Sequence, residues 1–193
     1  MGKTRTVGQY RAVDLTLYAL MLLVFEGVII VASARWFPGQ PWTVSVTPAL
    51  VGIVLVRWGA WAGIHAALGG VVLCALSRAG ASQWAVYCVG NLFPLLLLPL
   101  LSRWRRRAGV FRGGLQAVGF GLAVLLTMQC GRAAVSLVLG AQLSKAAGCF
   151  TTEVVTDLFT LMILWIARRL DGMLEDQERY YRRINETQTE GWA

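Results

Sequence analysis

Charged residues are scarce in this sequence. Asp, Glu, Lys and Arg together make up 15% of its 193 residues, whereas 56% are hydrophobic. Soluble globular domains carry about 25% charged residues, so this composition argues against a water-soluble protein. Apolar runs of about 20 residues recur along the chain, each long enough to cross a hydrocarbon core about 30 Å thick. The sequence therefore predicts an all-α integral membrane protein.

Groups for catalysis and metal binding are equally few. The single histidine, His65, has no Cys, Asp or Glu near it, and the four cysteines fit no zinc or disulfide spacing. The chain has no Ser/His/Asp set, no His-Glu-x-x-His and no phosphate-binding glycine loop. We therefore expect no enzyme, no metal and no cofactor, and we expect His65 to be packed or hydrogen-bonded inside the protein.

The net charge of +8 comes from basic residues at the ends of the apolar runs. This placement predicts contact with lipid headgroups rather than with nucleic acid. The first apolar run is too long for a signal peptide, so we expect no cleavable leader.

The number of spans depends on the stretch from Ala49 to Leu76, which is one long span or two short spans turning at "RWG", residues 57–59. With the turn, fourteen basic residues lie on the side of the termini and three on the other; with one long span the split is eleven to five and Arg57 is left in lipid. Basic residues favour the cytoplasmic side. We therefore predict six transmembrane helices in one compact bundle over residues 1–170, in the inner (plasma) membrane with both termini cytoplasmic. Residues 171–193 form a charged cytoplasmic tail.

Two segments indicate how the bundle is built. "WTVSVT", before Pro48, alternates polar and apolar residues like an extended strand, and such backbone at membrane depth must be covered by protein or line a cavity. We expect the proline-bearing loop after the first helix to line or roof a cavity on the outer side. "GAWAGIHAALGG" places small residues along one helical face, either for packing against a neighbouring span or for docking a partner subunit.

Polar residues gather in the predicted outer halves of the spans, whereas the inner halves are almost purely aliphatic. Glu153 and Asp157 share a helical face, and Arg132 lies at matching depth on the preceding span. Three interpretations remain open: an ion pair that locks two helices, an outward-opening ligand pocket, and a proton relay. No ionisable chain continues through the inner half, which weakens the relay. The candidate ligand-binding residues are Trp42, Thr43, Tyr87, Asn91, Gln129, Arg132, Glu153 and Asp157.

Over nearly its whole length the chain resembles the substrate-binding S components of energy-coupling factor (ECF) vitamin transporters. The resemblance rests on six short spans and on the segments "FPGQPWTVSVTP" and "RWGAWAGIHAALGG". It also rests on "YCVGNL", "QCGRA" and "RRLDGMLEDQ", which are similar to segments of bacterial S-component-like proteins. It implies high-affinity capture of a vitamin-like small molecule from outside, held by the outer loops and spans 4 to 6.

The resemblance also implies two partners, a transmembrane coupling subunit and its ATPases. Family members often dock through an Ala-x-x-x-Ala motif in the first span; the nearest match here is Ala12-x-x-x-Thr16. Two alternatives from other classes are a membrane scaffold of the MreD type and a small ion- or proton-coupled carrier.

Overall fold

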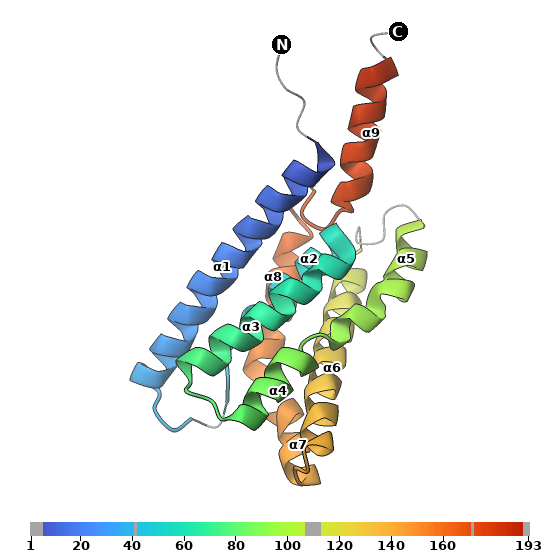
Figure 1. The fold of residues 1–193 in the computed structure, drawn as a ribbon. Helices are drawn as coiled ribbons and strands as arrows, with labels where there is room; N and C mark the ends of the chain where they lie inside the picture. Colours follow the sequence, from blue (N-terminus) through green and yellow to red (C-terminus); the bar gives the residue numbers. More distant parts are fainter. Residues whose placement is uncertain (1–5, 41, 107–112, 171, 191–193) are drawn as a thin grey trace.

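The computed structural model describes residues 6–40, 42–106, 113–170 and 172–190, which are helical with connecting turns and loops (Figure 1). Five stretches are long and apolar enough to cross a membrane: 7–36, 47–76, 81–103, 114–138 and 143–167. The helices are α1 (Val7–Trp36), α2 (Thr47–Trp58), η1 (Gly59–Trp61), α3 (Ala62–Leu76), α4 (Ala81–Gly90), η2 (Phe93–Leu97), α5 (Leu98–Arg106), α6 (Gly114–Val138), α7 (Leu143–Thr151), α8 (Val154–Ala167) and α9 (Gln177–Glu190).

The stretch 47–76 is folded back on itself. Gly59 has φ of 62°, a left-handed conformation that glycine adopts without steric cost, and it ends α2. The side chain of Thr47, at the start of α2, fills the space beside Gly69 of α3: a Cβ on Gly69 would lie 2.3 Å from Thr47 Cγ2. The two helices therefore run antiparallel, and the predicted turn at residues 57–59 is confirmed.

Helix α2 alone is too short to span a bilayer, because 12 residues rise about 18 Å. The preceding segment adds length in extended form. Thr43 N donates to Thr152 O at 2.9 Å, and Ser45 N donates to Thr156 Oγ1 at 3.1 Å. Residues 43–45 and 152–156 thus run in the same direction, and the four residues before Val46, at about 3.3 Å each, bring the combined length to roughly 31 Å. The predicted non-helical segment is confirmed; its last two residues, Ser45 and Val46, are buried, whereas Thr43 is exposed.

The last span is not one continuous helix. Helix α7 begins at Leu143, and the helix breaks at Glu153, which has φ of −104° and ψ of 10°. The span over residues 81–103 is broken too, since α4 ends at Gly90 and a 3₁₀ helix leads into α5. Hydropathy detects the apolar length of such a span but not a break of one or two residues.

Helix α2 forms the core. Every residue from Thr47 to Val56 is buried, as expected of a helix that is apolar on all sides. The small residues of α3 serve packing inside the chain: a Cβ on Gly63 would touch Leu95 at 3.1 Å, and one on Gly70 would lie 2.9 Å from the backbone of Tyr87. The packing interpretation of this face therefore holds at both positions.

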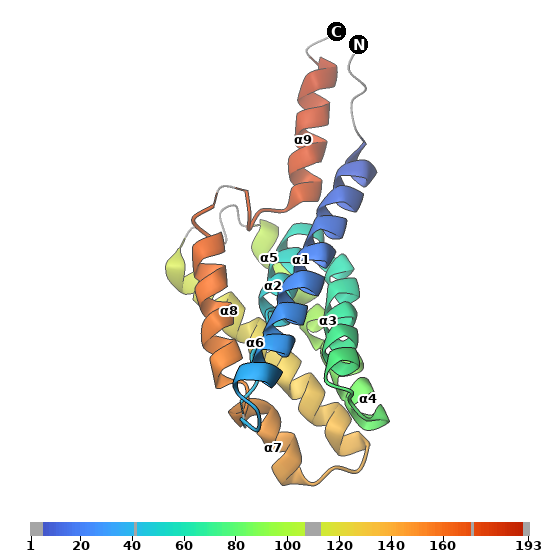
Figure 2. The same ribbon diagram turned by 90° about the vertical axis from the view of Figure 1, so that its left-hand side faces the viewer.

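The two ends of the molecule differ in charge. The start of α1 and the end of α9 lie at one end, together with the α2–α3 turn and the end of α5, while α7 marks the opposite end (Figures 1 and 2). We call these the basic end and the far end. The basic end carries Arg57 in the last turn of α2, Arg103 in α5 and Arg168 directly after α8, in line with the clustering of basic residues that the sequence predicts. Helix α9 extends beyond the bundle there, with Tyr181 stacked on Tyr10 of α1 at 4.2 Å between ring centroids.

Candidate functional site

A buried ion pair lies at the centre of the candidate site. Arg132 of α6 donates from Nη1 to Glu153 Oε1, and both side chains are almost completely buried. Arg132 Nε donates to Asn91 Oδ1 at 2.7 Å, and the guanidinium stands 4.9 Å from the ring centroid of Tyr87. Asn91 in turn donates from Nδ2 to Ala66 O at 3.2 Å. Four predicted residues, from the end of α4, from α6 and from the α7–α8 junction, thus meet in one cluster, which we call the Arg132 cluster: Tyr87, Asn91, Arg132 and Glu153.

Local breaks in the helices make the Arg132 cluster possible. Asn91 follows the last residue of α4, and Glu153 stands at the junction of α7 and α8. The Glu153 carboxylate and the Asn91 amide therefore project from breaks between helices and not from the middle of a regular helix. Glycines let α4 and α6 approach closely: a Cβ on Gly90 would lie 2.7 Å from Arg132 Cα, and one on Gly131 would lie 2.5 Å from Gly90 O.

Gln129 and Asp157 form a second pair beside this cluster. Gln129 Nε2 donates to Asp157 Oδ1 at 2.8 Å, and Gln129 is buried while Asp157 is half-buried. Glu153 and Asp157 keep the backbone relation of successive helical turns, since Asp157 N donates to Glu153 O at 2.9 Å. Among the described ion pairs, Glu153 has a cationic partner and Asp157 has none. The site thus holds two carboxyl groups and one guanidinium.

The two predicted residues on the loop lie apart from these side-chain contacts. Trp42 packs against Phe37, with ring centroids 5.7 Å apart, and Thr43 is exposed. Thr43 reaches the junction of α7 and α8 through its backbone, which bonds to Thr152 and receives a hydrogen bond from Thr156 Oγ1 at 3.0 Å. The main chain of Thr43 thus forms hydrogen bonds with residues on either side of the break at Glu153, whereas the Trp42 ring contacts Phe37.

Glu26, which the candidate set omits, has a structural role. It is fully buried, and its Oε2 accepts from Val46 N at 2.9 Å, Thr47 N at 3.2 Å and Thr47 Oγ1 at 3.1 Å. These are the free N–H groups at the start of α2, so Glu26 caps that helix from another helix. Two features of the sequence point to this role: a glutamate inside an apolar span, and a following helix with a proline in its first turn, whose N–H groups need an acceptor.

A second cluster that the sequence reasoning missed lies at the basic end. Arg57 donates to both carboxylate oxygens of Asp14, from Nε at 2.9 Å and Nη2 at 3.0 Å, and from Nη1 to Gly172 O at 2.7 Å. The fork of hydrogen bonds ties α1, the α2–α3 turn and the tail together. His65 is buried as expected, with Nε2 3.0 Å from Leu15 O.

Two cavities of the molecule lie elsewhere. One, of about 440 Å³, opens at the basic end, and the other, of about 430 Å³, is an apolar groove between α1 and α8. Neither is lined by a residue of the Arg132 cluster. Comparison with known proteins gave no matching family model, no similar curated protein and no similar solved structure.

Proposed function

We propose that this protein captures a small polar molecule at its far end and acts as the substrate-specific subunit of an ECF-type importer. The carrying observation is the half-buried Asp157, which accepts a hydrogen bond from the neutral amide of Gln129 while the adjacent Arg132 is paired with Glu153. Ionisable groups at membrane depth are costly and usually serve an ion or ligand pathway.

The charge of the site narrows the chemistry of the ligand. Arg132 balances Glu153, so the charge of Asp157 remains for a bound molecule. A ligand with an amino or other cationic group fits this excess, and the nearby amide of Gln129 offers a further polar contact. We therefore favour a cationic or zwitterionic micronutrient over an anionic one. Entry from outside requires the far end to face outward, with the basic end cytoplasmic as the positive charges favour.

Mass spectrometry of small molecules that co-purify with the detergent-solubilised protein tests this proposal. We expect a cation-bearing compound with the wild type and at least about a tenfold loss with Asp157→Asn, since one charge-assisted hydrogen bond is worth about 1.5–3 kcal/mol. The matched control is Asp176→Asn, at the basic end. Recovery of no ligand, together with no ATPase in pull-downs, contradicts the importer; a ligand retained by Asp157→Asn contradicts the site.

A second candidate, a membrane scaffold of the MreD type, is favoured by the completeness of the Arg132 cluster. Arg132 contacts Asn91, Glu153, Tyr87 and also Met128 Sδ, at 3.4 Å, and such a set of contacts can serve to lock helices. Replacing Arg132, Glu153 and Asp157 together by apolar residues of similar volume distinguishes the two. A scaffold keeps its function and its partners, whereas a capture protein loses its ligand. An ion- or proton-coupled carrier, by contrast, works without an ATPase partner.

A further inference from the structure

An apolar groove lies between α1 and α8, and residues of α2 line it as well. Figure 2 shows the ribbons of α1 and α8 on the near side of the bundle with α2 behind them. Its volume is about 430 Å³, and its lining includes Phe25 and Ile29 of α1, Leu50 and Ile53 of α2 and Ile163 of α8. From Tyr18 to Ile29 it follows α1 for about 16 Å at 1.5 Å per residue. This is half of a hydrocarbon core about 30 Å thick, or one leaflet of a bilayer.

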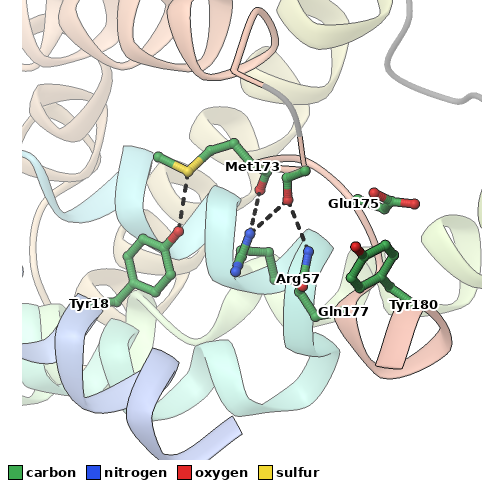
Figure 3. Close-up of a pocket in the computed structure, with 7 residues that line it drawn as sticks. Tyr18, Arg57, Met173, Glu175, Gln177 and Tyr180 are labelled. Carbon is green, nitrogen blue, oxygen red and sulfur yellow. Dashed lines mark hydrogen bonds between the residues drawn. The ribbon is translucent and has the colours of Figure 1, made fainter. Parts of the chain in front are cut away.

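The groove meets a polar pocket at the basic end. Figure 3 shows this pocket, of about 440 Å³, between Tyr18, Arg57 and the segment from Gly172 to Tyr180. Tyr18 and Met173 line both the groove and the pocket, and their Oη and Sδ atoms are 3.4 Å apart. Among the described residues that line the pocket, Arg57 and Glu175 are the charged ones, one of each sign, and Arg57 is also paired with Asp14. A polar space thus continues directly into an apolar one.

We propose that groove and pocket together form a binding site for one zwitterionic phospholipid of the leaflet at the basic end. One acyl chain lies in the groove, the phosphate meets Arg57, and the primary ammonium of an ethanolamine headgroup meets Glu175. This occupant matches three properties of the site: an apolar length that fits one leaflet, a lining from helices long and apolar enough to cross a membrane, and side chains of opposite charge beyond the apolar part. The proposal does not depend on ligand capture at the far end.

The headgroup decides the affinity. An acyl chain gains no hydrophobic free energy on leaving lipid for the groove, because both surroundings are apolar. Retention therefore depends on shape and on the polar pocket. Hydrogen bonds to Asp14, Gly172 O and Met173 O fix the position of the Arg57 guanidinium. They use at most four of its five N–H groups, so one donor remains for a phosphate oxygen. A bound lipid also bridges the bundle and α9, since Gln177 and Tyr180 line the pocket.

The groove is tested by native mass spectrometry of the full-length protein purified in mild detergent. Ile163→Trp fills the groove, whereas Leu158→Trp adds the same bulk on the exposed face of the same helix, where Leu158 is 66% exposed. We expect bound phospholipid to fall about tenfold in the first variant and to stay at the wild-type level in the second. Equal retention or equal loss in both variants overturns the proposal, because it indicates only surrounding lipid. Recovery of detergent instead of phospholipid also overturns it.

The headgroup is tested by adding phosphatidylethanolamine and phosphatidylglycerol separately to delipidated protein. We expect phosphatidylethanolamine to bind about tenfold more tightly, and Glu175→Gln to remove this preference while the control Glu178→Gln keeps it. Glu175 is exposed, so its substitution leaves the folded bundle intact. Equal binding of the two lipids by the wild type, or tighter binding of phosphatidylglycerol, refutes the assignment. A protein that captures no ligand at the far end would still give these lipid-binding results. Failure of one proposal can therefore be told apart from failure of the other.

Discussion

Substitution of Glu26 tests how the central helix is held. Helix α2 begins inside the bundle, where no water can satisfy its first N–H groups, and Pro48 removes one of them. Val46 N has the Glu26 carboxylate as its described acceptor, whereas Thr47 N also reaches Ser45 Oγ at 3.1 Å. Glu26→Ala therefore leaves the Val46 N–H buried without a partner and removes one acceptor from Thr47.

The magnitude follows from these contacts. A buried donor left without a partner costs about 1–3 kcal/mol, and the lost hydroxyl bond of Thr47 adds about 1 kcal/mol. The empty space left by the side chain increases the cost, so we expect Glu26→Ala to destabilise the fold by about 3 kcal/mol or more. Glu26→Gln keeps an oxygen that accepts these bonds but loses the carboxylate charge, so its cost should be about 1 kcal/mol.

The assay is unfolding of the purified protein by SDS in mixed micelles, followed by tryptophan fluorescence. The control is Thr16→Ala, which removes an exposed polar side chain from the same helix. We expect the order of stability to be wild type and Thr16→Ala, then Glu26→Gln, then Glu26→Ala. If Glu26→Ala unfolds like the wild type, within about 0.5 kcal/mol, the capping role is refuted.

Three further predictions concern other contacts. Gly90→Ala should destabilise the fold by about 1–3 kcal/mol, because its Cβ would lie 2.7 Å from Arg132 N. Gly119→Ala, with no atom within 4 Å, should stabilise it by about 0.5–1 kcal/mol; equal effects in SDS unfolding would contradict the close approach. Arg132→Met should cost about 3–5 kcal/mol by leaving Glu153 unpaired, and Glu153→Leu in the same chain should restore much of that in the same assay. Burial, with a smaller contribution from the Asp14 charge, raises the pKa of Tyr181, so the folded state favours its neutral phenol. Its contribution to tail docking should hold below about pH 10 and disappear as pH rises through the raised pKa, so proteolysis of α9 should increase there, and less so in Tyr181→Phe. A Tyr181→Phe profile identical to that of the wild type would count against this role.

The sequence predicts the class of the protein and much of its chain path. Low charge and long apolar runs predict a helical membrane protein, and the structure has helical stretches long and apolar enough to cross a membrane. The distribution of arginines predicts the turn that the structure contains at Gly59. Alternation in "WTVSVT" identifies the extended segment. Four of the candidate residues, Tyr87, Asn91, Arg132 and Glu153, meet as the depth of their positions predicts.

The tertiary structure decides how the polar groups are paired. Depth along a helix is set by sequence, since each residue rises a fixed distance, whereas the partner of a side chain depends on helix rotation, on breaks and on close approach. At the break between α7 and α8 the Glu153 carboxylate pairs with Arg132, whereas Asp157, one turn further on, accepts a hydrogen bond from Gln129. Glu26 and the start of α2 are joined by a contact across 20 residues, for which no local pattern exists. A carboxylate inside an apolar run predicts that the side chain needs hydrogen-bond partners. Only the folded chain determines which backbone groups provide them.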